Sequence, residues 1–284
     1  MYVLDSANVV HYNDDYVLCN KDIISNIIHK HEPYVMNYEI PIIYEDNDIV
    51  VVNKPSGMST HPGGRYNYNS VLTYLEEEKK CKLFVVHRLD RLTSGVLIFA
   101  KSSNKAREIQ FGFGKCHKSY ICRVIGNMES CVVDKPIKET ECITLSKVHI
   151  DENGKPSKTS FEKVFYDDKS DTTVVIAKPE TGRMHQIRVH LLSIGHPIAN
   201  DSMYRDMKEN VIVDNVKDEF KCDSCDECKR GVSVSLEELW LHAFEYKITI
   251  NGKEVTFTTD KPQWSDQSFD AKVYIEHWIK VHSL

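Results

Sequence analysis

The sequence feature best suited to chemistry is a carboxylate, Asp90, that lies among side chains able to carry positive charge. His87 and Arg88 precede it, Arg91 follows it, and apolar runs of strand length flank the segment at 83–86 and 96–100. An ionised carboxylate presented by a loop on such a scaffold can act as a nucleophile or as a base. The alternative for a lone Asp beside Arg is an ordinary loop ion pair of little energetic weight.

The string around Asp90 favours the first interpretation. Residues 87–95 run His-Arg-Leu-Asp-x-x-Thr-Ser-Gly. This string resembles the active-site motif of the RluA-type pseudouridine synthases, in which the Asp is the catalytic residue. The resemblance therefore implies that Asp90 is the catalytic carboxylate.

Further strings resemble motifs of the same family, in the family's order, between about residues 40 and 250. They are Val-Val-Asn-Lys-Pro-Ser-Gly at 51–57 with His-Pro at 61–62, Lys-x-Tyr-x-x-x-Val-x-Gly at 118–126, Thr-Gly-Arg-x-His-Gln-Ile-Arg-Val-His at 181–190 and Leu-x-Leu-His-Ala at 239–243. Each string alone is weak evidence, but chance agreement of all of them is improbable.

The resemblance implies further site residues. Arg188 and Tyr120 would be catalytic residues beside Asp90: Arg188 would pair with the Asp and favour its charged form, and Tyr120 would stack on the target base. The C5 proton must also be removed, for which Tyr120 and a water are the candidates. Arg88 would fill the space that the base leaves. The other predicted substrate-binding residues are His87, Lys118 and Leu241. By spacing alone, Tyr120 would be a half-buried strand residue and Arg188 an exposed helix residue.

The reaction that the resemblance implies is an isomerisation of uridine in RNA. It breaks the bond between uracil and ribose, rotates the base and forms a carbon–carbon bond, so we expect no cofactor and no metal. Asp90 could attack ribose C1′, attack uracil C6 or abstract a ribose proton, and the sequence leaves these alternatives open. The target base must first flip out of its stack, at a cost of a few kcal/mol.

The expected fold is α+β, with a mixed, mainly antiparallel central sheet flanked by helices around a central cleft. Apolar patterns predict strands at 40–44, 48–53, 96–100, 118–126, 159–166, 172–179, 239–248 and 254–258, and helices at 70–78, 102–113 and 272–282, with helical spacing from 184 to 194. Residues 127–158 show little periodicity.

The predicted organisation is an N-terminal arm, or the remnant of an S4-like accessory module, at 1–37 and a catalytic domain at 38–284. An acidic insert at about 205–235 contains Cys222, Cys225 and Cys228. Their spacing is compatible with zinc, but no fourth ligand lies nearby, so we predict a loop rather than a metal site. A zinc deaminase is rejected, because His31-Glu32 lacks the spacing of that signature and no Pro-Cys-x-x-Cys follows.

The charge distribution suits an RNA partner despite a formal net charge of −6. Between residues 101 and 123 there are six cations and one acid, directly after the Asp90 motif. The His-Glu-Pro segment at 31–33 and the cysteine insert resemble features of the eukaryotic branch that modifies tRNA, of the anticodon-loop uridine 32 type. Ribosomal RNA as substrate, and an RNA-binding or RNA-folding protein without catalysis, are the alternatives.

The remaining expectations concern the cell and the assembly. No apolar run approaches the roughly 20 residues of a membrane helix, and the N-terminus has no signal-peptide pattern. We therefore expect a cytoplasmic monomer without an obligatory protein partner, with nuclear or mitochondrial locations left open.

Overall fold

The computed structural model describes residues 2–4, 10–11, 16–25, 32, 35, 39–114, 116–140, 147–205 and 238–274. The three cysteines of the acidic insert, nearly all of that insert and most of the predicted C-terminal helix lie outside these residues. No helix in the described part of the chain is long and apolar enough to cross a membrane.

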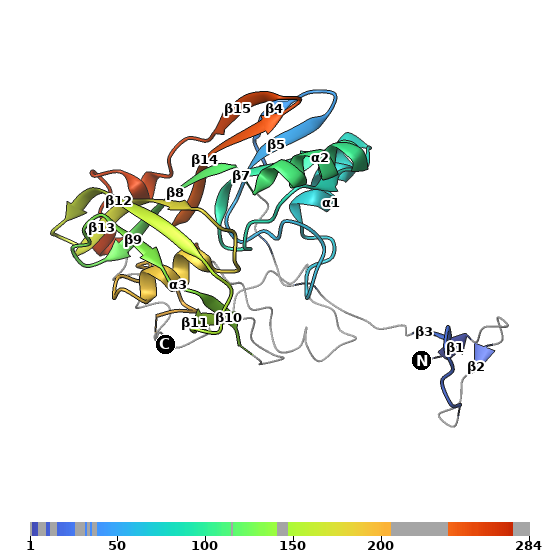
Figure 1. Ribbon diagram of the computed structural model, residues 1–284. Coiled ribbons are helices and arrows are strands. Elements are labelled where there is room, and N and C mark those ends of the chain that lie inside the picture. Colours follow the sequence, from blue (N-terminus) through green and yellow to red (C-terminus); the bar gives the residue numbers. More distant parts are fainter. Residues whose placement is uncertain are drawn as a thin grey trace, which may run out of the picture.

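Three short strands near the N-terminus form a sheet of their own. They are β1 (Tyr2–Leu4), β2 (Val10–His11) and β3 (Ile23–Ser25), in the order β2-β1-β3. Figure 1 shows them apart from the central sheet. Glu32, farther along, accepts the backbone N–H groups of residues 67, 68 and 69. The segment after the small sheet thus contacts the main body, and the boundary at residues 37 and 38 stays a prediction.

The first half of the central sheet consists of β4 (Ile42–Glu45), β5 (Ile49–Lys54), β6 (Phe84–Val85) and β7 (Ser94–Ala100). The apolar runs of β5 and β7 are almost fully buried, and α1 (Val71–Lys79) and α2 (Ser103–Phe113) belong to the same half. Ser70 and Ser102 cap these helices through backbone N–H groups three residues ahead. A mainly hydrophobic core thus supports the loop between β6 and β7 that carries Asp90.

The second half consists of β8 (His117–Ile125), β9 (Cys131–Asp134), β12 (Lys158–Asp167) and β13 (Thr172–Pro179), with α3 (Gln186–Leu192) against it. β10 (Ile137–Glu139) and β11 (Val148–Ile150) form a separate pair, and a 3-10 turn, η2 (Gln263–Ser265), lies near the C-terminal end. β9, β10 and β11 fall in the region that the sequence left unassigned. They have three or four residues each, too few for a period of two to be distinguished.

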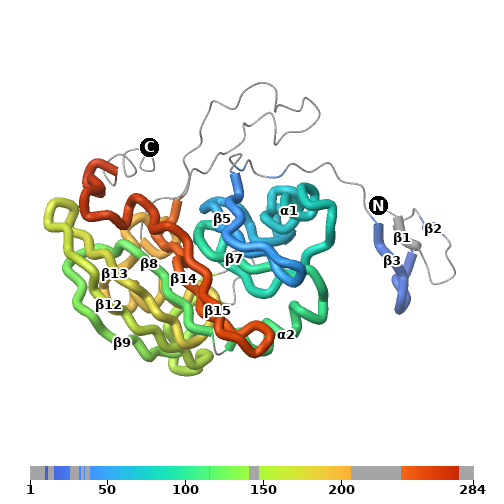
Figure 2. Tube along the Cα trace, turned by 90° about the horizontal axis from the view of Figure 1, so that it is seen from above, coloured from blue at the N-terminus to red at the C-terminus, as the bar shows by residue number. Residues whose placement is uncertain are grey.

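One late strand joins the two halves. β14 (Leu241–Ile250) pairs parallel with β7 and antiparallel with β8, and the Asn251-Gly252 turn leads into β15 (Lys253–Thr258). The main path of the sheet is β4-β5-β7-β14-β8-β13-β12-β9, and Figure 2 shows β14 between the halves. Among the described strands, all pairs of this sheet except β7 with β14 are antiparallel, in agreement with the predicted mixed, mainly antiparallel sheet.

Gly95 makes the parallel junction possible. Its φ is +111°, and a Cβ at this position would lie 2.1 Å from the carbonyl oxygen of Ala243 on β14. The backbones of β7 and β14 can approach this closely because Gly95 has no side chain. Ser94 strengthens the junction through its hydroxyl, which lies 2.8 Å from Nδ1 of His242. The Thr-Ser-Gly end of the Asp90 motif therefore fixes where the loop meets the sheet.

Candidate active site

A cavity of about 570 Å³ lies where the two halves of the sheet meet, and residues of both halves line it. The predicted site residues all border this one cavity: His87, Arg88, Asp90, Lys118, Tyr120, Arg188 and Leu241. They come from the loop before β7, from β8, from α3 and from β14. The fold thus gathers side chains that are up to 154 positions apart in the sequence, from 87 to 241.

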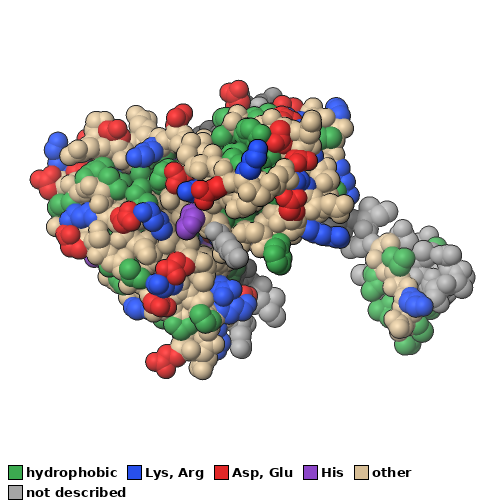
Figure 3. All heavy atoms as spheres, turned by 45° about the horizontal axis from the view of Figure 1, so that its top comes forward, with side chains coloured by type: hydrophobic (Ala, Val, Ile, Leu, Met, Phe, Trp, Pro, Cys, Tyr) green, Lys and Arg blue, Asp and Glu red, His purple; other side chains and the backbone are tan. Residues whose placement is uncertain are grey.

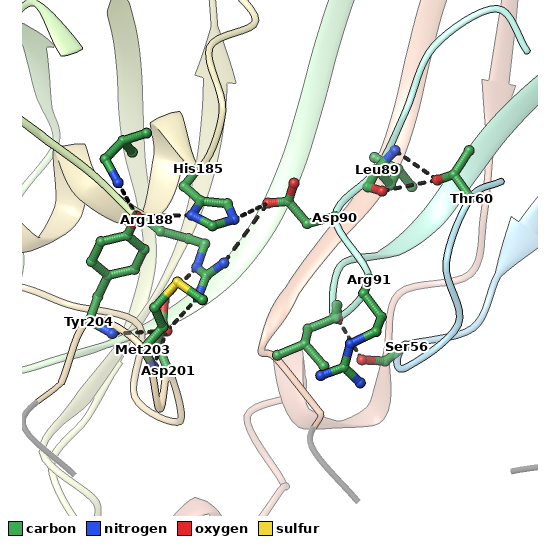
Figure 4. A network of polar contacts seen from close by, with 12 residues as sticks. Ser56, Thr60, Leu89, Asp90, Arg91, His185, Arg188, Asp201, Met203 and Tyr204 are labelled. Atoms are coloured by element: carbon green, nitrogen blue, oxygen red, sulfur yellow. Dashed lines mark hydrogen bonds and ion pairs between the residues drawn. The ribbon is translucent and has the colours of Figure 1, made fainter. Parts of the chain in front are cut away.

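The loop of Asp90 is anchored on both sides of the carboxylate. Thr60 Oγ1 accepts the N–H of Leu89 at 3.2 Å and donates to its carbonyl at 2.9 Å, while Ser56 donates to the carbonyl of Leu92 at 2.5 Å. Figure 4 shows these contacts on one side of Asp90. The Asp90 side chain itself stays 29% exposed. The backbone is therefore held while the carboxylate remains open to the cavity.

Lys54 holds this loop from inside the protein through hydrogen bonds to three backbone carbonyls. Its ammonium is fully buried and lies 2.9, 2.6 and 2.9 Å from the carbonyls of Pro55, Met58 and Arg91. Burial lowers the pKa of Lys54 to about 7, an effect that the charge of Asp90 opposes. These hydrogen bonds connect the end of β5 to Arg91, the residue that follows Asp90.

Arg188 faces Asp90 but is held mainly by another acid. Its Nη1 lies 4.0 Å from Oδ2 of Asp90, whereas its Nε and Nη2 each lie 2.7 Å from an oxygen of Asp201. Both members of this bidentate pair are buried, at 3% and 1% exposure. The ion pair between Arg188 and Asp90 that the resemblance implies is present at 4.0 Å, with Asp201 as a second and closer partner. The exposed helix position that spacing alone favours is wrong. Asp90 is left loosely paired.

Tyr120 presents a neutral phenol to the cavity. Its hydroxyl lies 2.5 Å from that of Tyr246 on β14, and the two rings meet edge to face at 5.9 Å. Burial raises the pKa of Tyr120 well above its ordinary value of 10. The phenol therefore stays protonated at neutral pH, and a phenolate base at this position is disfavoured.

His87 is fixed by the scaffold. Its Nε2 accepts the backbone N–H of Ile98 at 3.2 Å, and its ring stacks on Phe113 at 4.6 Å. Burial, together with the nearby charge of Lys118, lowers the pKa of His87 to about 3. The ring is a neutral part of the cavity wall, so the structure supports a positioning role more than direct contact with an anionic substrate.

Cations surround the cavity, although fewer than the sequence stretch at 101–123 indicates. Lys118 lies with its Nζ 5.0 Å from the Phe113 ring centre, and among the described residues no carboxylate pairs with it. Arg88 and Arg183 are exposed and line the cavity. Three cations of the stretch are instead engaged with acids elsewhere, namely Lys101, Lys105 and Arg123. On the face in Figure 3, basic and acidic side chains are interspersed.

Comparisons with known proteins identify the family of this site. A family model described as RNA pseudouridylate synthase matches residues 48–193. The chain belongs to the RNA pseudouridylate synthase family. The family predicted from the motifs is thereby confirmed.

Two yeast relatives and one human structure illustrate the similarity. The mitochondrial tRNA pseudouridine(32) synthase of Saccharomyces cerevisiae is 42% identical over 69% of this chain and 44% of its own length. The tRNA pseudouridine(31) synthase of the same yeast is 32% identical over 88% of this chain and 79% of its own length. The human RNA pseudouridylate synthase domain containing 1 superposes with a TM-score of 0.62 at 21% identity, over 88% of this chain and 98% of that structure. This last likeness confirms the fold class. The chain spans less than half of the first relative.

Several residues in or next to the cavity are not identified by the motif roles. Lys54 and His185 lie inside the quoted motifs, but no role was assigned to them. Asp201 and Tyr204 lie 13 and 16 residues after Arg188, beyond the end of α3. One signal was available, because a buried arginine needs a carboxylate partner and Asp201 is the first acid after Arg188 in the chain.

The described residues contain no cluster of three or more His, Cys, Asp or Glu side chains that could hold a metal ion. The cysteines of the insert, whose spacing is compatible with zinc, are not among the described residues. The carboxylates that line the cavity are Asp90 and Glu139, and Glu139 lies 3.6 Å from Lys155. Asp90 is the one with an arginine and a histidine directed at it.

Proposed function

We propose that this protein isomerises uridine to pseudouridine in tRNA, at position 31 or 32 of the anticodon loop, with Asp90 as the essential carboxylate. The observation that carries the proposal is the shared cavity: the motif residues of four separate strings converge on one carboxylate. The choice of tRNA rests on the two yeast relatives, whose names state positions 31 and 32 of tRNA.

The cavity offers what each step of the isomerisation needs. The uridine flips out of its stack at a cost of a few kcal/mol, and Arg88 at the cavity edge can occupy the vacated space. The base then lies between Tyr120 and Leu241, where stacking on the tyrosine contributes roughly 1–3 kcal/mol. The cations Lys118 and Arg183 face the phosphates.

The reaction is redox-neutral and balances within the nucleotide. The bond from N1 to C1′ breaks, the bond from C5 to C1′ forms, N1 gains a proton and C5 loses one. Asp90 acts at C1′, at C6 or on a ribose proton. Because the pKa of Tyr120 is raised by burial, its phenolate is a poor candidate for removing the C5 proton, and a water in the cavity is favoured.

A tritium-release assay on tRNA labelled at uridine C5 tests the activity. Asp90→Asn should lower the turnover rate by at least about 1000-fold while RNA affinity stays within a few fold, because the amide cannot attack or take a proton. Glu139→Gln, which changes the other carboxylate of the cavity, is the matched control and should keep near-normal turnover.

The same RNA then distinguishes the alternatives. Carbodiimide modification and primer extension should give a stop that marks position 31 or 32 in treated tRNA and none with Asp90→Asn. Modification of ribosomal RNA alone would assign the protein to that substrate. RNA binding without release of tritium from tRNA or ribosomal RNA would leave an RNA-binding protein and contradict the proposal.

A further inference from the structure

The side chain of His185 lies between the Asp90 carboxylate and the half-buried phenol of Tyr204. Its Nε2 lies 3.7 Å from Oδ2 of Asp90, and its Nδ1 lies 2.9 Å from the hydroxyl of Tyr204. His185 lines the same cavity as Asp90. Figure 4 shows the ring between these two groups, next to Arg188. Nothing in the reaction as described so far uses this residue.

The hydrogen bonds of Tyr204 determine which ring nitrogen carries the proton. The backbone N–H of Val148 donates to the Tyr204 oxygen at 3.1 Å, so this oxygen already accepts one hydrogen bond. The phenol has one proton to donate, and Nδ1 of His185 is the acceptor that lies within reach among the described residues. A neutral imidazole that accepts at Nδ1 carries its proton on Nε2, the nitrogen that faces Asp90.

The charge states agree with this arrangement. Burial lowers the pKa of His185; the charges of Asp90 and Asp201 oppose this effect, and those of Arg188 and Arg88 reinforce it. The ring is therefore neutral at neutral pH. Burial also raises the pKa of Tyr204, which keeps its phenol protonated and able to donate.

The two contacts of Asp90 leave one oxygen unused. Both His185 Nε2, at 3.7 Å, and Arg188 Nη1, at 4.0 Å, face Oδ2. Among the described residues, none bonds Oδ1. A carboxylate held through one oxygen keeps its orientation and still presents the other oxygen to a substrate. Contacts of this length commonly shorten when substrate fills a site.

The backbone of His185 points to a use beyond folding. His185 precedes α3 with φ 50° and ψ 22°, in the left-handed region, and its side chain makes no capping hydrogen bond to the helix. This conformation costs roughly 1–2 kcal/mol for most residues and less for Gly or Asn. A role limited to starting the helix would favour Asn or Gly, yet the chain keeps an imidazole turned toward Asp90.

We propose that His185 is a positioning residue, whose Nε2–H, fixed in place by Tyr204, orients Oδ2 of Asp90 so that Oδ1 faces the target uridine. The proposal rests on the proposed function of the cavity. Asp201 acts alongside it, because its bidentate grip on Arg188 limits how strongly that guanidinium can bind Asp90.

Two substitutions of His185 separate positioning from folding. The amide nitrogen of His185→Gln can reach the place of Nε2 and donate to Asp90, whereas the shorter side chain of His185→Asn reaches only the place of Nδ1. Asn, however, suits the left-handed backbone better. We expect His185→Gln to keep kcat within about 5-fold and His185→Asn to lose about 10- to 100-fold, with KM little changed in both. Equal kcat values for the two variants, or a higher kcat for His185→Asn than for His185→Gln, would overturn the proposal.

A second measurement needs no substrate. In protein labelled with ¹⁵N at histidine, the ring signals of residue 185, assigned by their loss in His185→Asn, should show an acceptor at Nδ1 and a proton at Nε2. Tyr204→Phe should give a mixture of tautomers and a lower kcat at unchanged RNA affinity. Tyr166→Phe is the control, because it removes a phenol that donates to exposed Asp171. It should change neither the tautomer of His185 nor kcat.

The two measurements keep the proposals distinguishable. A protonated Nδ1 in the unchanged protein would overturn the role of Tyr204 whatever the activity. Absence of tritium release from the unchanged protein, together with the expected tautomer, would refute the proposed function and leave the hydrogen-bond geometry standing.

Discussion

Among the single residues of the site, Asp90 is distinguished by how loosely its carboxylate is held. The contacts to its side chain are long, 3.7 and 4.0 Å, whereas the backbone on either side is anchored by hydrogen bonds of 2.5–3.2 Å. A carboxylate in a tight bidentate ion pair is stabilised and less reactive. Asp201 makes that tight pairing, so the geometry separates the acid that fixes Arg188 from the acid that we propose to react.

His87 makes a measurable contribution to the acid stability of the site. Its pKa is about 3 in the folded chain against an ordinary value of 6.5, so between these values the unfolded chain binds a proton that the folded chain does not. The contribution of His87 to the unfolding free energy is therefore fully present above pH 6.5, and it is lost progressively as pH falls toward 3. At pH 5 the loss amounts to up to about 2 kcal/mol, with partial exposure of the ring reducing it.

Denaturant unfolding at pH 7 and pH 5 checks this effect. His87→Gln removes the titrating ring while its amide oxygen can still accept from the Ile98 N–H, so the difference in unfolding free energy between the two pH values should shrink. His117→Gln, at an exposed position of β8, is the control and should leave that difference unchanged. If His87→Gln left the pH dependence of the unfolding free energy unaltered, His87 would not be the source of the loss of stability at low pH.

Among the elements, the junction of β7 and β14 leaves no room for a side chain at Gly95. Gly95→Ala would place a methyl group 2.1 Å from the Ala243 carbonyl oxygen, at a φ of +111° that L side chains rarely adopt. We expect a loss of about 3 kcal/mol or more in unfolding free energy, and weaker RNA modification because the loop that carries Asp90 ends at this junction. Urea unfolding measures the first effect.

Gly63→Ala is the matched control for this junction. A Cβ at Gly63 would meet no atom within 4 Å, and its φ lies outside the left-handed region. Its unfolding free energy should stay within about 0.5 kcal/mol of the unchanged chain. Comparable losses for the two variants would show that the close approach of β7 and β14 is not what constrains Gly95.

How far the sequence predicts this molecule differs between its elements. The capped helices α1 and α2, the hairpin of β12 and β13 and the Asn-Gly turn before β15 carry local signals, and they form near the predicted positions. The parallel pairing of β7 with β14 joins segments about 150 residues apart and has no local signature. β9, β10 and β11 are too short to be recognised.

The candidate site was predictable from the sequence only to the same extent. The predicted residues share one cavity because the motifs identified them, but the partners that hold them were not predicted. A buried lysine such as Lys54 contradicts the usual preference of lysine for solvent, and the bidentate contact of Arg188 with Asp201 depends on a turn after α3. Such contacts depend on the assembled fold.

For the molecule as a whole, the net charge is −6, so the proposed RNA substrate requires a local concentration of cations such as the one at the cavity edge. Arg183 is exposed beside the cavity, so Arg183→Gln should weaken tRNA binding and lower the slope of log Kd against log salt concentration by about 1. Arg107→Gln changes an exposed arginine of α2 that does not line the cavity, and both quantities should stay unchanged. Filter binding at several salt concentrations measures the slope.

The late position of β14 in the chain has a consequence during protein synthesis. Until residues 241–250 leave the ribosome, β7 and β8 have no strand to connect them, and Asp90 and Tyr120 belong to separate pieces of sheet. The proposed reaction at Asp90 therefore requires that residues 241–250 have been synthesised and have paired with both strands.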